Sequence, residues 1–258
     1  MLTAITRGVS PAIVNCELTF LQRAPISLAK AVEQHAAYER ALQHFGARVV
    51  SLPAEPSLAD SMFVEDPALV LDELAVIFPL GTESRRPEAE SLAKALSPYR
   101  ELKYVRLPGT MEGGDILRID RRIFAGLSKR TDTEGIRQLQ AIVEPHGYQV
   151  TAVPVTGCLH LKSAVTSLGE NILLANRAWF DASCLAGFEW IDVAAEEPHA
   201  ANALAFRNTA IVPASFPLTG ARIAARGFEV MPLDISELQK AESGLTCSSL
   251  LFAAKSST

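Results

Sequence analysis

A strand-and-hairpin unit recurs along this chain, and it constrains the fold more than any other feature of the sequence. A short apolar strand marked by Pro or Ala occurs five times, as ARVVSLP, LKYVRLP, YQVTAVP, FEWIDVA and FEVMPLD. The marking residues lie 38 to 55 residues apart, at Pro53, Pro108, Pro154, Ala194 and Pro232. Repetition at a period of this size indicates several copies of one supersecondary unit that pack against one another.

An apolar hairpin follows each of the first four marked strands, with a short polar turn between its two runs. The hairpins read ALVLDELAVIF, DILRIDRRIFAG, AVTSLGENILLA and ALAFRNTAIV. The fifth marked strand leads only to CSSLLFAA, a single strand without a partner, while LTAITR is left over near the N-terminus. Pairing of these two strands would close the units into a ring, which removes open sheet edges.

A helical pattern precedes each marked strand. Apolar residues recur at spacings of three and four in AKAVEQHAAYERALQHFG, PEAESLAKALSPY and TDTEGIRQLQAIVEPHG, and more weakly in RAWFDASCLAGF and PLTGARIAARGF. No Gly/Ser tract, Pro-rich run or charge block marks a linker. The sequence therefore predicts an α/β propeller of five strand, hairpin and helix modules around a pseudo-fivefold axis, as one domain over residues 1–258.

Charge and hydropathy exclude some classes of partner. The net charge of -5 leaves no basic surplus to neutralise phosphates, so we expect no nucleic-acid partner. Polar residues interrupt every apolar run well short of a membrane span, and the opening MLTAITRGVSP lacks the apolar segment of a signal peptide. We expect a cytoplasmic protein with no membrane partner. Its four cysteines lie far apart with no CxxC pair, which favours free thiols over disulfides or a zinc site.

Reactive residue types fall at the same position of successive modules, between a marked strand and the hairpin or strand that follows it. In a closed ring, these positions all face one central hole. They hold Asp60, Glu65, Asp66, Glu112, His160, Asn202 and Cys247. Taken singly, each has an ordinary structural explanation, such as a small buried cysteine or a solvated carboxylate. Their recurrence at one position indicates a site.

The chemistry of this set favours a cationic substrate. A cysteine needs a nearby base or cation to become a thiolate at neutral pH, and a histidine held by a carboxylate provides one. Several carboxylates in one hole repel one another unless a cation enters. A planar guanidinium with several N–H donors fits them best, and its charge would also favour the thiolate.

Two arginines precede predicted helices, where the helix macrodipole disfavours positive charge. They are Arg85 in TESRRPEAE and Arg130 in LSKRTDTEG. Each is either an exposed side chain with a small local cost or a ligand for the carboxylate of an amino acid substrate. The local sequence leaves both interpretations open.

At these residues the chain resembles the guanidino-group-modifying superfamily, the pentein fold, and within it the dimethylarginine dimethylaminohydrolases. The likeness is carried, in family order over nearly the whole chain, by CELTFL, EQHAAYERAL, DSMFVEDPALV, GTESRRPE, EGGDILR, GLSKRTDTEGIRQL, GCLHLKSAV, AAN and SGLTCSSLLF. The resemblance implies a five-bladed α/β propeller that hydrolyses methylated arginine to citrulline and an alkylamine through a covalent thiouronium intermediate. It places the chain among hydrolases of amidine C–N bonds, class EC 3.5.3, without a cofactor.

The resemblance also implies roles for individual residues. Cys247 would be the nucleophile, His160 the general acid and base, and Glu112 the carboxylate that orients the histidine and contacts the guanidinium. The remaining expectations are Asp60, Glu65 and Asp66 on the guanidinium, Arg85 and Arg130 on the α-carboxylate, and the backbone carbonyls of Leu18 and Ala241 on the α-amino group. The sequence departs from the family pattern at residues 78–80, Phe-Pro-Leu, and at Glu242, where aspartate is usual.

Other functions remain open at this point. The nearest rivals are an arginine deiminase and a citrulline or other ureido hydrolase of the same fold, because a pocket for two methyl groups changes selectivity by only about 1 to 3 kcal/mol. A non-catalytic pentein that binds a macromolecule is a second class, although it has no need of a complete Cys, His and Glu set. A papain-like protease is disfavoured, because that fold has its cysteine early and its histidine late in the chain, whereas here His160 precedes Cys247.

The sequence carries weaker indications about metal binding and oligomeric state. Nothing in the sequence requires a metal, but a thiolate, a histidine and carboxylates in one hole predict reversible inhibition by micromolar zinc. A homodimer is a family-level expectation. The predicted partner is a small guanidino amino acid.

Overall fold

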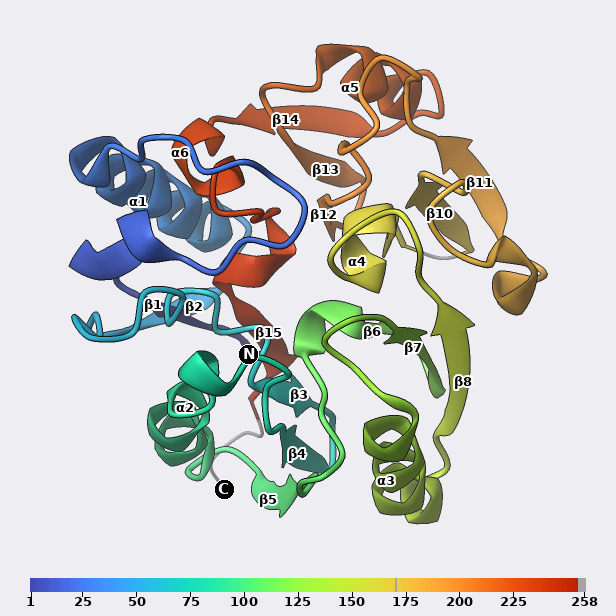
Figure 1. The fold of residues 1–258 in the computed structure, drawn as a ribbon. Coiled ribbons are helices and arrows are strands. Elements are labelled where there is room, and N and C mark those ends of the chain that lie inside the picture. The colour runs from blue at the N-terminus through green and yellow to red at the C-terminus, as the bar shows by residue number, and fades with distance from the viewer. Residues whose placement is uncertain (170, 255–258) are drawn as a thin grey trace.

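Five three-stranded sheets surround a central axis in the computed structural model, which describes residues 1–169 and 171–254 (Figure 1). The strand orders are β15-β1-β2, β3-β4-β5, β6-β7-β8, β9-β10-β11 and β12-β13-β14. In every sheet the middle strand pairs antiparallel with one neighbour and parallel with the other. The predicted five-module α/β propeller is confirmed, and the five marked strands are the parallel strands of the five sheets.

The elements have the following bounds. The strands are β1 Leu2–Arg7, β2 Arg48–Leu52, β3 Ala68–Val70, β4 Leu74–Ile77, β5 Glu101–Tyr104, β6 Ile116–Ile119, β7 Arg122–Leu127, β8 Gln149–Pro154, β9 Val165–Ser167, β10 Ile172–Ala175, β11 Glu189–Asp192, β12 Leu204–Phe206, β13 Thr209–Pro213, β14 Glu229–Leu233 and β15 Leu250–Ala253. The α-helices are α1 Leu28–His44, α2 Glu88–Leu96, α3 Thr133–Val143, α4 Leu161–Ala164, α5 Pro217–Ala224 and α6 Ser236–Gln239. The 3-10 helices are η1 Pro11–Asn15, η2 Glu83–Arg85, η3 Gly113–Asp115, η4 Glu144–His146, η5 Ala182–Leu185 and η6 Thr246–Ser248.

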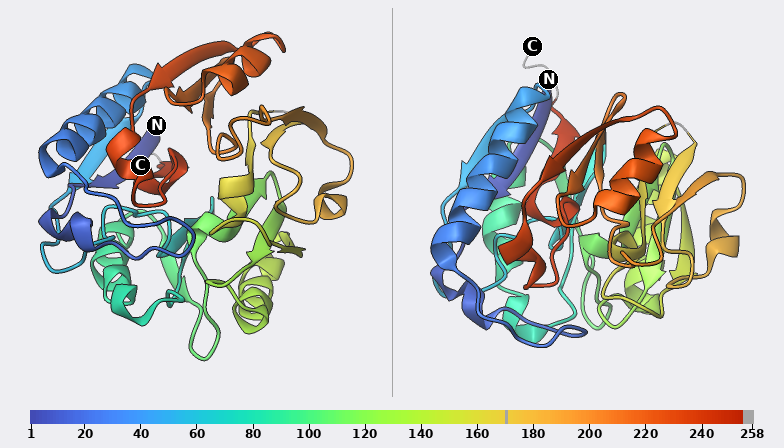
Figure 2. Two further views of the ribbon diagram at one scale, coloured as in Figure 1. Left: turned by 45° about the horizontal axis from the view of Figure 1, so that its top comes forward. Right: turned by 90° about the horizontal axis from the view of Figure 1, so that it is seen from above.

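The ring closes through the two ends of the described chain. Strand β1 pairs antiparallel with β15, from Leu2 opposite Ala253 to Ile5 opposite Leu250. Strands β1 and β15, the first and last of the described chain, therefore lie side by side (Figure 2). The predicted pairing of LTAITR with the strand after Cys247 is confirmed.

Four of the five predicted helices form, as α1, α2, α3 and α5, and the fourth prediction is wrong. The stretch RAWFDASCLAGF forms only the short 3-10 helix η5. The side chain of Asp181 accepts the backbone N–H of Ser183, two residues on, and Gly187 has a φ of 93°. A local side-chain bond of this kind competes with a regular helix, and a positive φ ends one.

The apolar core is divided among the modules. Five clusters of buried apolar side chains each join residues of neighbouring modules; one of them contains Ile5 and Leu250 from the closing sheet together with Leu92 and Leu96 of α2. Burial between modules leaves the loops around the axis free to carry polar groups. None of the helices in the described part of the chain combines the length and apolarity that a membrane crossing requires. The single-domain prediction includes residues 170 and 255–258, which lie outside the described residues, and it stays a prediction.

Candidate active site

A small cavity of about 20 Å3 lies among loops that follow the marked and the middle strands of the sheets. Its walls are formed by Glu17, Asp60, Phe63, Asp66, Arg85, Arg130, Leu159, His160, Ala241, Glu242, Ser243 and Cys247. Seven of the ten residues predicted from the sequence line it. The other three, Glu112, Glu65 and Leu18, are not among its lining residues. Glu112 is hydrogen-bonded to His160, which lines the cavity.

Cys247 lies in η6, immediately before the ring-closing strand β15. Its Sγ accepts the backbone N–H of Gly244 at 3.4 Å, and its carbonyl accepts the N–H of Glu65 at 3.3 Å. Burial of the thiol, together with the charges of Glu65 and Asp66, raises the pKa of Cys247 to about 12. The sulfur is therefore a neutral thiol in the free protein at neutral pH, and a cation beside it would lower this pKa.

His160 and Glu112 form a buried pair. The His160 Nε2 lies 2.7 Å from Oε2 of Glu112, and Glu112 is completely buried. Burial alone would lower the pKa of His160, but the charges of Asp66, Asp115 and Glu112 and its bond to Glu112 outweigh burial and raise this pKa to about 9. Burial alone would raise the pKa of Glu112, but the bond to His160 and the charges of His160, Arg85 and Arg130 lower it to about 2. The pair is thus an imidazolium and a carboxylate near neutral pH.

The motif EGGD positions the histidine in a way that the sequence reasoning missed. Oδ1 of Asp115 accepts the backbone N–H of Leu161 at 2.9 Å, and Oδ2 accepts the hydroxyl of Ser128 at 2.7 Å. A Cβ on Gly114 would lie 2.5 Å from the His160 ring, so a side chain there would displace the imidazole. The signal was the motif itself, because its glycines serve close approach and its aspartate fixes the residue after the histidine.

Arg85 lies in the cavity wall between carboxylates. Its Nε and Nη2 donate to the two oxygens of Glu88 at 3.0 and 2.9 Å, and its Nη1 donates to Asp66 at 2.9 Å. Glu88 was not among the predicted site residues, although its position three residues after Arg85 suits an ion pair on one helical turn. Much of the donor capacity of Arg85 is committed to these two carboxylates.

Arg130 is less committed to carboxylates than Arg85. Its Nη1 contacts the Thr82 hydroxyl and lies 3.4 Å from Oε1 of Glu112, while its Nη2 donates to the Thr19 hydroxyl at 3.0 Å. Two of its three partners are neutral hydroxyls. An incoming carboxylate can exchange with such partners at little cost, because a charged acceptor binds a guanidinium more strongly than a hydroxyl does.

Glu65 has partners that the sequence did not indicate. Its Oε1 pairs with Nζ of Lys162, and its Oε2 accepts the hydroxyl of Thr246 at 2.8 Å. Both oxygens are therefore occupied, and the side chain lines a second cavity, beside the innermost strands of the sheets, with Lys162 and Thr246. Glu65 therefore lies beside Cys247 as an engaged carboxylate, and its expected contact with a guanidinium stays a prediction. The sequence placed Glu65 at the hole but gave no sign of its partner, 97 residues away.

Asp60 and Leu18 belong to the entrance of the cavity. Oδ2 of Asp60 accepts the backbone N–H of Glu17 at 3.1 Å, and the other oxygen has no such partner among the described residues. Burial raises the pKa of Asp60, and the nearby charge of Arg85 partly opposes this. Leu18 is half-buried and packs against the apolar cluster that contains Tyr38 and Leu245. Asp60 thus meets the cavity beside residues 17–21, which we call the lid segment.

Asp66, Glu112 and His160 also satisfy the spacing of a metal site. One ligand atom from each lies within 4.8 Å of the other two, and all three residues are buried. Carboxylate oxygens and imidazole nitrogen are ligands that zinc accepts. The predicted inhibition by zinc stays a prediction, with this trio as its expected binding place.

The raised pKa of the Cys247 thiol predicts how its reactivity changes with pH. Only the thiolate is alkylated, so the rate of modification of Cys247 by iodoacetamide should rise about tenfold per pH unit between pH 7 and 9, without a plateau. Mass spectrometry of the peptide that contains Cys247 measures this rate separately from the other cysteines. A plateau below pH 8 would contradict the expectation, because it would mean that the thiolate already exists in the free protein.

The chain is similar to several known proteins. A family model described as "N,N dimethylarginine dimethylhydrolase, eukaryotic" matches residues 19–212. The N(G),N(G)-dimethylarginine dimethylaminohydrolase of Pseudomonas aeruginosa is 39% identical over 226 residues, which are 87% of this chain and 89% of that protein. The protein of the same name from Streptomyces coelicolor is 35% identical over 248 residues, 96% of this chain and 95% of that one.

Two solved structures extend the comparison. A mutant of the Pseudomonas aeruginosa enzyme with a cysteine changed to serine, in complex with citrulline, matches with a TM-score of 0.92 and 35% identity, and covers 98% of this chain and 100% of that one. The N-terminal domain of ArgZ, a cyanobacterial arginine dihydrolase, matches with a TM-score of 0.88 at 19% identity over 98% of each chain, which is a likeness of fold.

Proposed function

This chain belongs to the dimethylarginine dimethylaminohydrolase family, and we propose that it hydrolyses Nω-methylated arginine to citrulline and an alkylamine. One observation carries the proposal. Cys247 and His160 line one cavity rich in carboxylates, and the histidine is paired at 2.7 Å with the buried Glu112. A nucleophile, a proton donor and a binding site for a planar cation therefore meet at one place.

The substrate lies with its guanidinium between Cys247 and the carboxylates of Asp66 and Glu112. These two carboxylates stand near His160 and fix the planar cation by charge-assisted hydrogen bonds. The cation also offsets the charges that keep the thiol protonated, so its arrival lowers the pKa of Cys247 and a proton leaves for solvent. The nucleophile thus forms when a substrate is present to receive it.

The amino acid end of the substrate lies toward the lid segment. Arg130, whose partners are mainly hydroxyls, binds the α-carboxylate, and Arg85 contributes charge from its place between Asp66 and Glu88. Asp60 has an available oxygen beside the lid segment, which suits the α-ammonium, together with the backbone carbonyls expected from Leu18 and Ala241. The geometry thus favours Asp60 as a partner of the ammonium over the guanidinium expected from the sequence.

The reaction proceeds in two halves. In the first, the Cys247 thiolate attacks the guanidinium carbon, and His160 gives its proton to the departing alkylamine as the C–N bond breaks. This leaves an S-alkylthiouronium on Cys247 and a neutral imidazole on His160. In the second half, His160 takes a proton from water as the water attacks the same carbon. As the C–S bond breaks, the added hydroxyl loses its remaining proton to solvent and becomes the carbonyl of citrulline, the thiolate is restored, and His160 is again the imidazolium.

A panel of four substrates tests the proposal. We expect release of dimethylamine from asymmetric dimethylarginine and of methylamine from monomethylarginine, with kcat/KM at least about tenfold above that for ammonia release from arginine. Citrulline should be inert as a substrate. Equal or faster turnover of arginine would instead identify an arginine deiminase of the same fold, and turnover of citrulline alone would identify a ureido hydrolase. Absence of turnover on all four would favour the non-catalytic pentein. A homodimer and a cytoplasmic location stay predictions.

A further inference from the structure

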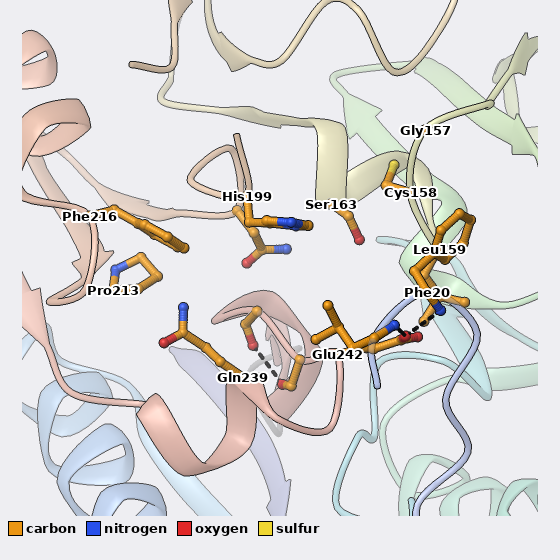
Figure 3. Close-up of a pocket in the computed structure, with 14 residues that line it drawn as sticks. Phe20, Gly157, Cys158, Leu159, Ser163, His199, Pro213, Phe216, Gln239 and Glu242 are labelled. Carbon is orange, nitrogen blue, oxygen red and sulfur yellow. Dashed lines mark hydrogen bonds between the residues drawn. The ribbon is translucent and has the colours of Figure 1, made fainter. Parts of the chain in front are cut away.

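The carboxylate of Glu242 binds three consecutive backbone N–H groups of the lid segment. Its Oε1 accepts from Phe20 and Leu21 at 2.5 Å each (Figure 3). The N–H of Thr19 lies 3.0 Å from each of the two carboxylate oxygens. Successive backbone N–H groups that point at one centre form an anion-binding concavity. Here the anion comes from the same chain, more than 220 residues away in sequence.

The backbone at Glu242 is held in an unusual conformation. Its φ is 57°, in the left-handed region that residues other than glycine rarely adopt. Such a conformation is strained and persists only where the surroundings fix it. Glycine would suit this position better for the backbone alone.

Glu242 stands where the lid segment meets the catalytic cavity. Its neighbours Ala241 and Ser243 line that cavity, as it does itself. It also lines an adjoining, mostly apolar pocket of about 210 Å3, whose wall includes Phe20 and Leu21. Phe216 lies across this pocket from Phe20 (Figure 3). The lid segment therefore forms part of the boundary between the cavity and this outer pocket, and Glu242 holds it there.

Other contacts to the lid segment are made mainly through side chains. Ser84 donates to the Glu17 carboxylate at 2.6 Å, Arg130 donates to the Thr19 hydroxyl at 3.0 Å, and the Lys129 ammonium lies 5.2 Å from the centre of the Phe20 ring. An incoming α-carboxylate that binds Arg130 would compete with its bond to Thr19. The Glu242 contacts do not involve the substrate-binding groups and would survive substrate binding.

We propose that Glu242 is a positioning residue that holds the lid segment closed over a bound guanidino amino acid; the inference rests on the proposed function of the same site. Glu242 itself does not touch the reacting atoms. Its carboxylate accepts charge-assisted hydrogen bonds from three backbone N–H groups of the lid segment, and each such bond is stronger than one between neutral groups. Loss of these bonds leaves the segment free to open, which weakens substrate binding more than it slows the chemical step.

The test compares substitutions at Glu242 with a matched control. Glu242→Gly removes the carboxylate and relieves the left-handed backbone, which offsets part of the stability lost with the hydrogen bonds. Arg207→Gly relieves the same strain, at a φ of 54°, in the exposed turn between β12 and β13 and away from the lid segment. Glu242→Asp keeps the charge but shortens the reach by one methylene. We expect KM for dimethylarginine to rise about tenfold to hundredfold in Glu242→Gly, less in Glu242→Asp and not at all in Arg207→Gly, with kcat within about threefold throughout.

Hydrogen exchange provides a readout that does not depend on turnover. The amides of Thr19, Phe20 and Leu21 should be protected in the parent protein and in Arg207→Gly, and should lose about tenfold or more of this protection in Glu242→Gly. Unchanged protection and unchanged KM in Glu242→Gly would overturn the proposal. So would a fall in kcat at constant KM, because that would place Glu242 in the chemistry. If the parent protein turns over no guanidino substrate, the proposed function fails, and the exchange rates alone decide whether Glu242 holds the lid segment.

Discussion

Replacing Cys247 by serine should reduce the production of citrulline from dimethylarginine by about 10^4-fold or more. A serine hydroxyl is far less acidic than a thiol, and no group in the cavity is placed to ionise it: His160 is already the imidazolium at neutral pH. The smaller oxygen can still accept the Gly244 N–H that now reaches Sγ, so the loop should keep its shape. We therefore expect a folded protein that still binds substrate.

The matched control for this substitution is Cys184→Ser. Cys184 is also partly exposed, but it lies in η5, outside the residues that line the cavity. Its replacement should leave turnover within about twofold of the parent and Tm nearly unchanged. Activity of Cys247→Ser within about 100-fold of the parent, measured on every guanidino substrate, would remove Cys247 from the role of nucleophile.

Replacing His160 by glutamine should reduce kcat by about 10^2- to 10^4-fold and should change which species accumulates. Glutamine can fill part of the imidazole space and bond to Glu112, but it can neither protonate the departing amine nor activate water. The second half of the reaction should suffer at least as much as the first, so a covalent thiouronium should build up on Cys247. Intact-protein mass spectrometry after rapid acid quench detects this adduct, and its absence in His160→Gln/Cys247→Ser assigns it to the cysteine.

His199→Gln is the control for the histidine. His199 lines the adjoining apolar pocket, where its ring packs at 4.8 Å from that of Trp179, and it is not among the residues of the catalytic cavity. Burial lowers the pKa of His199, in contrast to the raised pKa of His160. We expect nearly parental kcat in His199→Gln. Equal losses in the two variants would point to general destabilisation and would argue against a proton-transfer role for His160.

The repeated strands predicted the ring and its closure, because each module had to bury its apolar hairpin against the next. The same repeat placed Cys247, His160 and Glu112 at equivalent positions, and the structure brings them together. Hydrogen bonds between a side chain and the nearby backbone were harder to predict. The fourth predicted helix does not form, because the Asp181 side chain accepts the backbone N–H of Ser183. A periodic pattern indicates which face of a helix is apolar, but it does not indicate where a side chain competes for the backbone N–H groups of that helix.

The sequence did not determine which charged side chains of the site pair with one another. Lys162 neutralises Glu65, and Glu88 takes two N–H groups of Arg85, so two residues expected to face the substrate are engaged elsewhere. Position in a repeat indicates that charges will meet in one hole. It does not indicate which of them pair, since that depends on side-chain reach across an interface that only the folded ring defines.

The closing strand also fixes the order in which the site is assembled during synthesis. Cys247 has the highest number of all the predicted site residues and precedes β15 by only a few positions, so a ribosome makes every binding and proton-transfer group before it makes the nucleophile. A nascent chain that carries the carboxylates, arginines and histidine but has not yet paired β15 with β1 has no sulfur in place. The reactive thiol is therefore made only just before the strand that completes the ring, and a chain truncated before Cys247 is expected to lose both the closing strand and the nucleophile.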